Sequence, residues 1–94
     1  MDITVKEFKK IMYDVNNIID IRSYDKYNLG TILNAKNISV NELLFHYDRY
    51  LEKGVDYYIF CDNGVSSKKL SVLLSKLGYS VYNIVGGYSK FVLD

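Results

Sequence analysis

The sequence contains no tryptophan and no proline, and it has only one cysteine and one histidine. A single cysteine cannot form an internal disulfide, and one Cys with one His supplies too few ligands for a typical structural metal site. No apolar run approaches the roughly 20 residues that a membrane-spanning helix needs. The opening stretch MDITVKEFKK has neither the apolar core nor the small-residue cleavage site of a secretion signal. We therefore expect a cytoplasmic protein with no metal, no cofactor and no membrane contact.

An excess of charge of one sign is also lacking. The chain has 12 Lys and Arg against 11 Asp and Glu, for a net charge of +1, and the two signs are well mixed. A nucleic-acid surface would instead show clustered Lys and Arg, so we expect no nucleic-acid partner. With 94 residues, of which 49% are hydrophobic, the chain is long enough for one small core. We expect a single domain over residues 1–94.

Helical and strand patterns alternate along the chain. Thr4 with Glu7, and Ser39 with Glu42, have the spacing of a capping box, and Ser23 is a further N-cap candidate. An expected helix begins at each of these caps. The helix that begins at Ser23 ends at Gly30, and the one that begins at Ser39 ends at Gly54. Another helix starts at Ser66 or Ser67 and ends before Gly78, and the last is a short one within 86–94. Expected strands are 17–21, 35–39, 56–60 and 81–85. This alternation predicts an α/β fold, with a parallel sheet and helices on its faces.

The single cysteine, Cys61, follows the strand 56–60 directly and precedes a helix. Sites in parallel sheets form where strands end and loops lead into helices. Gly64 allows a tight backbone path that turns consecutive N–H groups toward one point, and Ser66 or Ser67 could cap the helix. Such an environment should lower the pKa of the thiol below its reference of about 8.5. The alternative is an unreactive cysteine buried at a strand end, since free Cys is often buried.

Two longer motifs resemble the rhodanese-like sulfurtransferases. IIDIRSYDKYNLGTILNAKNI (18–38) is similar to the family's first signature, although Thr31 stands where His is usual and Asn34 where Gly is usual. YIFCDNGVSSKKLSVLLSKLGYSVYNIVGGYSKF (58–91) resembles the second signature, with Phe91 where Trp is common. The positions that fit the first signature are Asp20, Arg22, Tyr27, Gly30, Ile32, Ala35, Asn37 and Ile38.

The resemblance implies a rhodanese-like fold, with a sheet of about five strands flanked by helices on both faces, and a thiol that cycles through a persulfide. It implies that Asp20 and Arg22 brace the site. A related class of phosphate-handling cysteine enzymes carries an Arg six positions after the cysteine, for a bidentate grip on the oxyanion. Ser67 stands at that position here, which disfavours phosphoryl transfer. A thiol-based arsenate reductase would need a resolving cysteine, which this chain lacks.

We therefore expect a sulfurtransferase in which Cys61 takes a sulfane sulfur from thiosulfate or a persulfide and passes it to a thiophilic acceptor. The alternative is a binding or sulfur-relay module that acts on partner proteins. Lys68 and Lys69, in the first turn of the helix, form either an electropositive rim or an ordinary solvated surface. Asp62 should repel the thiosulfate dianion and make turnover slow, unless it points away from the mouth. The expected cradle of the sulfur consists of Asp62, Asn63, Gly64, Val65, Ser66 and Ser67.

Overall fold

The computed structural model describes residues 1–94 and contains a five-stranded sheet in the order β1-β5-β4-β2-β3. All four neighbouring pairs are parallel, so β4 is the central strand and every strand ends at the same edge of the sheet. The strands are β1 (Asp2–Ile3), β2 (Ile18–Asp20), β3 (Lys36–Asn37), β4 (Asp56–Phe60) and β5 (Ser80–Ile84). The predicted parallel α/β architecture with about five strands is confirmed.

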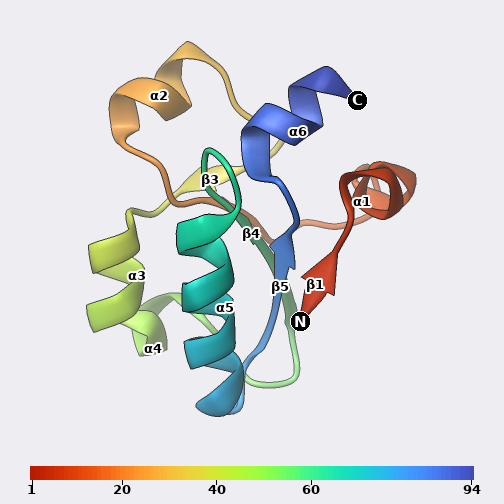
Figure 1. Ribbon diagram of the computed structural model, residues 1–94. Helices are drawn as coiled ribbons and strands as arrows, with labels where there is room; N and C mark the ends of the chain where they lie inside the picture. Colours follow the sequence, from red (N-terminus) through yellow and green to blue (C-terminus); the bar gives the residue numbers. More distant parts are fainter.

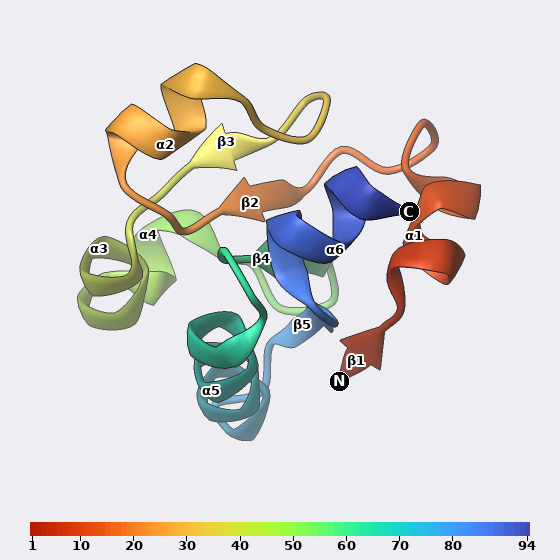
Figure 2. The ribbon, with the colours of Figure 1, turned by 45° about the horizontal axis from the view of Figure 1, so that its top comes forward.

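Six helices surround the sheet: α1 (Val5–Ile11), α2 (Tyr24–Leu29), α3 (Val40–Phe45), α4 (Tyr47–Tyr50), α5 (Val65–Lys76) and α6 (Gly87–Leu93). Helices α3, α4 and α5 cover one face, and α1 and α6 cover the other (Figure 1). Helix α2 lies near β3 (Figure 2), and α2 and α6 lie at the same end of the molecule (Figure 1). None of the helices has both the length and the apolar character needed to cross a membrane.

The core consists of two clusters, one on each face of the sheet, and β4 contributes to both. Side chains alternate along a strand, so Tyr57 and Ile59 pack under α3, α4 and α5, whereas Tyr58 and Phe60 pack under α1 and α6. Cys61, directly after β4, continues this alternation and belongs to the first cluster. The thiol is therefore placed by the register of the central strand.

Local capping signals position three helices as expected. Thr4 and Glu7 form a complete capping box at α1, and the Ser23 side chain accepts from the N–H of Lys26 at α2. The Ser39 side chain likewise accepts from the N–H of Glu42, but Glu42 does not reach back and instead accepts from the Tyr50 hydroxyl. The second expected capping box is thus only half formed.

One expectation needs correction, and one strand was not predicted. The helix predicted over 39–54 is interrupted at His46, whose φ of −133° and ψ of 35° separate α3 from α4. This break lets Tyr47 pack edge-on against Tyr79 and brings Leu51 into the core at 4% exposure. The strand β1 was not predicted, because its two residues carry no periodicity and pair with β5 at the far end of the chain.

Candidate active site

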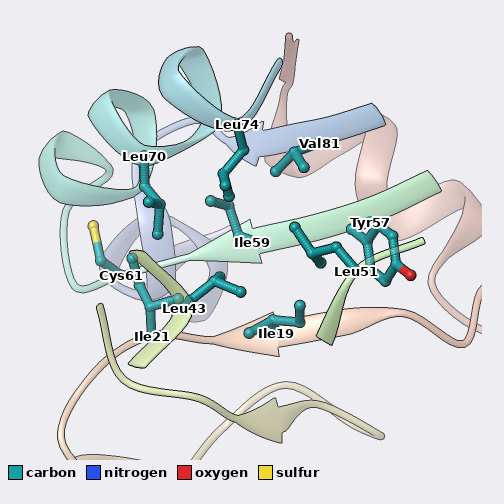
Figure 3. Close-up of a cluster of buried hydrophobic side chains, with 10 residues drawn as sticks. All are labelled: Ile19, Ile21, Leu43, Leu51, Tyr57, Ile59, Cys61, Leu70, Leu74 and Val81. Atoms are coloured by element: carbon teal, nitrogen blue, oxygen red, sulfur yellow. The ribbon is translucent and has the colours of Figure 1, made fainter. Parts of the chain in front are cut away.

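Cys61 lies directly after the central strand, at the edge where all five strands end. Figure 3 shows it at one end of the first core cluster, with the sulfur turned toward α5 and away from Ile21. The residue is only 7% exposed. The strand therefore presents one nearly buried sulfur atom to the loop that follows it.

Gly64 shapes this loop. Its φ of +90° lies in the left-handed region that side chains disfavour, and a Cβ there would lie 2.8 Å from the backbone nitrogen of Gly86. The loop thus needs glycine for two reasons, its conformation and its close contact with a neighbouring turn. The predicted role of Gly64 in a tight backbone path fits this geometry.

Hydrogen-bond donors converge on the Sγ atom of Cys61. The N–H groups of Gly64 and Ser67 point at it, with N···S distances of 3.2 and 3.4 Å, and the Ser67 Oγ lies 3.3 Å away. Burial raises the pKa of Cys61, but hydrogen bonds from the Ser67 side chain and from the backbone of Ser67, Gly64 and Asn63 lower it by more. The net effect is a pKa below the ordinary value, so the surroundings favour the thiolate.

Neither Ser66 nor Ser67, the two predicted cap residues, caps helix α5. Helix α5 begins after Gly64 without a side-chain cap, and Ser67 is fully buried against the sulfur. Ser66 is exposed and lines a groove between α3 and α5. The N–H of Val65 is bonded to the Asn63 side chain, at 3.1 Å. Of the expected cradle, Gly64 and Ser67 donate backbone hydrogen bonds to the sulfur at 3.2 and 3.4 Å, and the backbone of Asn63 also lowers the pKa of Cys61.

Asp62 points toward α2. Its carboxylate forms an ion pair with Lys26 at 2.6 Å and lies 3.9 Å from the guanidinium of Arg22. These groups, together with Tyr88 of α6, line a shallow pocket of about 300 Å³ beside the cysteine loop. Lys68 is instead held by Asp2 of β1, at 2.9 Å. The cation nearest to the loop carboxylate is therefore Lys26, whereas Lys68 is paired with Asp2 on β1.

Asp20 and Arg22 form a buried bidentate pair. The Arg22 Nε and NH2 groups donate to the Asp20 carboxylate at 3.0 and 2.8 Å, and NH2 also donates to the carbonyl of Gly30. Thr31 donates to the same carboxylate at 2.8 Å, from the position where the resemblance led us to expect His. The Asp20 hydrogen bond raises the pKa of Arg22. This arrangement fits the bracing role predicted for the pair.

Sequence reasoning assigned no role to the residues of α6 that hold the loop in place. The N–H groups of Tyr88 and Ser89 donate to the carbonyls of Cys61 and Asp62 at 2.8 and 2.9 Å. A Cβ on Gly87 would collide with this same stretch of backbone. The Gly86–Gly87 motif in the sequence could have indicated this close approach of two backbones.

Comparison with known proteins identifies close structural relatives. The model of the rhodanese-like domain family matches residues 4–94. The structure of a rhodanese-like domain protein from Staphylococcus aureus has a TM-score of 0.85 at 30% identity, covering 97% of this chain and 91% of that one. The human single-domain sulfurtransferase TSTD1 shares the fold, with a TM-score of 0.83 at 22% identity over 99% of this chain and 96% of that one. A tRNA uridine(34) hydroxylase from Pelagibacter ubique is 30% identical over 93% of this chain, which spans 30% of that protein.

Proposed function

Because this chain belongs to the rhodanese-like domain family, we propose that it is a sulfurtransferase that carries a sulfane sulfur as a persulfide on Cys61. The observation that carries this proposal is the set of donors around Sγ, formed by the N–H groups of Gly64 and Ser67. Donors of this kind stabilise the anionic sulfur on which the reaction depends.

The reaction proceeds in two displacements. With thiosulfate, the Cys61 thiolate attacks the outer sulfur, a new S–S bond forms, and the old S–S bond breaks as sulfite leaves with its electron pair. The terminal sulfur of the persulfide then carries the negative charge. A thiophilic acceptor such as cyanide or a second thiol takes this sulfur, and Cys61 leaves as the thiolate. No proton has to be removed during either step once the thiolate is present.

The residue at the sixth position after the cysteine supports sulfur chemistry over phosphoryl transfer. That residue is Ser67, whose side chain contacts Sγ, so no guanidinium faces the cysteine from α5 to grip a tetrahedral oxyanion. Arg22 is the nearest guanidinium, and most of its donors are occupied by Asp20 and Gly30.

Intact mass spectrometry after incubation with thiosulfate tests the proposal. We expect a gain of one sulfur atom that cyanide removes, and no gain in the Cys61→Ser variant. A protein persulfide should be tried as a second donor, because the sulfur is nearly buried and a protein could be the natural source. Absence of loading with either donor would contradict the sulfurtransferase and favour a binding module that acts on partner proteins.

A further inference from the structure

Asn83 of β5 connects the cysteine site to the first strand of the sheet. It is 3% exposed, and its side-chain oxygen accepts a hydrogen bond from the Ser67 hydroxyl at 2.5 Å. Its side-chain nitrogen donates to the Asp2 carboxylate at 3.3 Å. Because Ser67 Oγ also contacts Sγ at 3.3 Å, a continuous polar chain runs from Cys61 through Ser67 and Asn83 to Asp2.

Asp2 fixes the direction in which the Asn83 amide points. The hydrogen bond from Lys68 lowers the pKa of Asp2, so this carboxylate is ionised at neutral pH and can only accept. A rotated amide would place the Asn83 oxygen against the Asp2 carboxylate and lose a hydrogen bond. The oxygen of Asn83 is therefore held toward Ser67.

The Ser67 hydroxyl has one proton and two neighbours that could accept it. In the thiol state every group is satisfied, because the Cys61 S–H can donate to Ser67 and Ser67 can donate to Asn83. In the thiolate state the sulfur also requires a donor, and Ser67 can serve only one of the two acceptors. If Ser67 turned to the sulfur, two oxygen atoms 2.5 Å apart would face each other without a proton between them.

We propose that Asn83 is a positioning residue whose carbonyl competes with the Cys61 thiolate for the Ser67 hydroxyl proton, so that the loop N–H groups provide most of the stabilisation of the thiolate and Ser67 provides less than it would without Asn83. The consequence differs between states of the sulfur. In a thiol or a persulfide Sγ is neutral and does not need this proton, so Asn83 disfavours only the thiolate. Asn83 thereby increases the nucleophilicity of the thiolate and favours its conversion to the loaded form. The catalytic part of this inference rests on the proposed function, whereas the effect on the thiolate does not.

Other charged groups surround Cys61, but none is hydrogen-bonded to Sγ. Those nearest to the cysteine loop are Asp2 on β1, Asp20 at the end of β2, Arg22 after β2, Lys26 on α2, Asp62 in the loop, and Lys68 and Lys69 in the first turn of α5. All of these except Lys69 are engaged in ion pairs with one another. Ser67 is therefore the one side chain through which Asn83 can act on the sulfur.

The pH dependence of alkylation by iodoacetamide tests this inference without any sulfur donor. In Asn83→Leu, Ser67 is free to donate to the thiolate, and the midpoint of the rate profile should move to lower pH. At about pH 6 the rate should rise about threefold, since roughly tenfold more thiolate is partly offset by lower nucleophilicity. On the alkaline plateau the rate should fall about threefold for the same reason. The two profiles should therefore cross, which a merely structural defect would not produce.

A second set of variants tests whether Asn83 acts on Cys61 through Ser67. These variants do not require the fold to accept a leucine at the buried position 83. Asp2→Asn leaves Asn83 in place but allows its amide to rotate, so it should shift the profile in the same direction by a smaller amount. Asp48→Asn removes the same charge from an exposed position of α4 and should leave the profile unchanged. Both shifts should disappear in a Ser67→Ala background. Superimposable profiles for wild type and Asn83→Leu, or a shift that persists without the Ser67 hydroxyl, would overturn the inference, even if sulfur loading is normal.

Discussion

The Nζ atom of Lys26 lies 2.6 Å from Oδ2 of Asp62, so a cation from α2 faces the carboxylate that directly follows the cysteine. The two side chains are separated by 36 positions in the chain and meet because α2 and the loop after β4 lie at the same edge of the sheet. Both are about half exposed, so the pair contributes less than about 1 kcal/mol to folding. Its importance is electrostatic, because it reduces the repulsion that Asp62 alone would exert on an incoming anion.

We therefore predict opposite effects on thiosulfate turnover for the two partners. Lys26→Met leaves Asp62 without its cation and should lower kcat/KM for thiosulfate roughly three- to tenfold. Asp62→Asn leaves Lys26 free to attract the dianion and should raise kcat/KM by a similar factor. Both effects should shrink at high salt, because the charges are exposed.

Steady-state kinetics at two ionic strengths measures this pair of effects. Lys6→Met, which removes an exposed charge from α1, provides the control for net charge and should have little effect. Rates that are unchanged in both partner variants would show that the Lys26–Asp62 pair does not face the substrate.

The reactivity of Cys61 should have a shifted pH dependence. The surroundings lower the pKa of its thiol, so the thiolate is present at a lower pH than in an unstructured peptide. We expect the iodoacetamide rate of the folded protein to reach its plateau at lower pH than that of a model peptide thiol. Unfolding in urea should return the profile to that of the peptide. A folded profile that already matches the peptide would favour an inert buried cysteine instead.

Gly64→Ala should abolish most sulfur loading while the domain remains folded. Its φ of +90° and the close approach of Gly86 both oppose a side chain at this position. Gly54 is a matched control, since its φ is +84° but no atom lies within 4 Å of the Cβ it would gain. Gly54→Ala should cost about 1 kcal/mol of stability and leave loading intact. Equal loading in the two variants would exclude the loop geometry as the basis of the site.

The parts of this fold that sequence could predict are those specified by short-range contacts. The Thr4, Ser23 and Ser39 side chains each accept from an N–H three residues ahead, a spacing visible in the sequence. The strand 56–60 was predicted with its observed bounds, because an apolar run before the loop has no competing helical pattern. The same local pattern located the cysteine loop, and the family motifs then indicated sulfur chemistry there.

Contacts distant in the sequence could not be predicted in this way. Ser67 reads locally as a helix cap, yet its hydroxyl is bound by Cys61 and by Asn83, 16 positions later. Asn83 itself lies inside an apolar strand pattern that gives no sign of its partner Asp2, 81 positions away. Charge patterns failed for the same reason, since no periodicity relates Lys26 to Asp62.

The Asp20–Arg22 pair should be far more important for stability than the neighbouring Lys26–Asp62 pair. The Asp20 carboxylate is fully buried and accepts from both Arg22 and Thr31, so its removal leaves a buried guanidinium without its main partner. Breaking a buried ion pair of this kind costs about 3–5 kcal/mol of the free energy of unfolding. Asp20→Ala should therefore move the urea midpoint much further than Asp62→Ala, which should cost less than about 1 kcal/mol. Asp62 also lies 3.9 Å from Arg22, so both variants remove a carboxylate near the same guanidinium. A difference between their urea midpoints therefore reports the burial of Asp20 and not only the loss of a negative charge. Equal shifts in the two variants, at an unchanged dependence on urea concentration, would show that Arg22 finds other partners and that Asp20 does not brace the loop edge of the sheet.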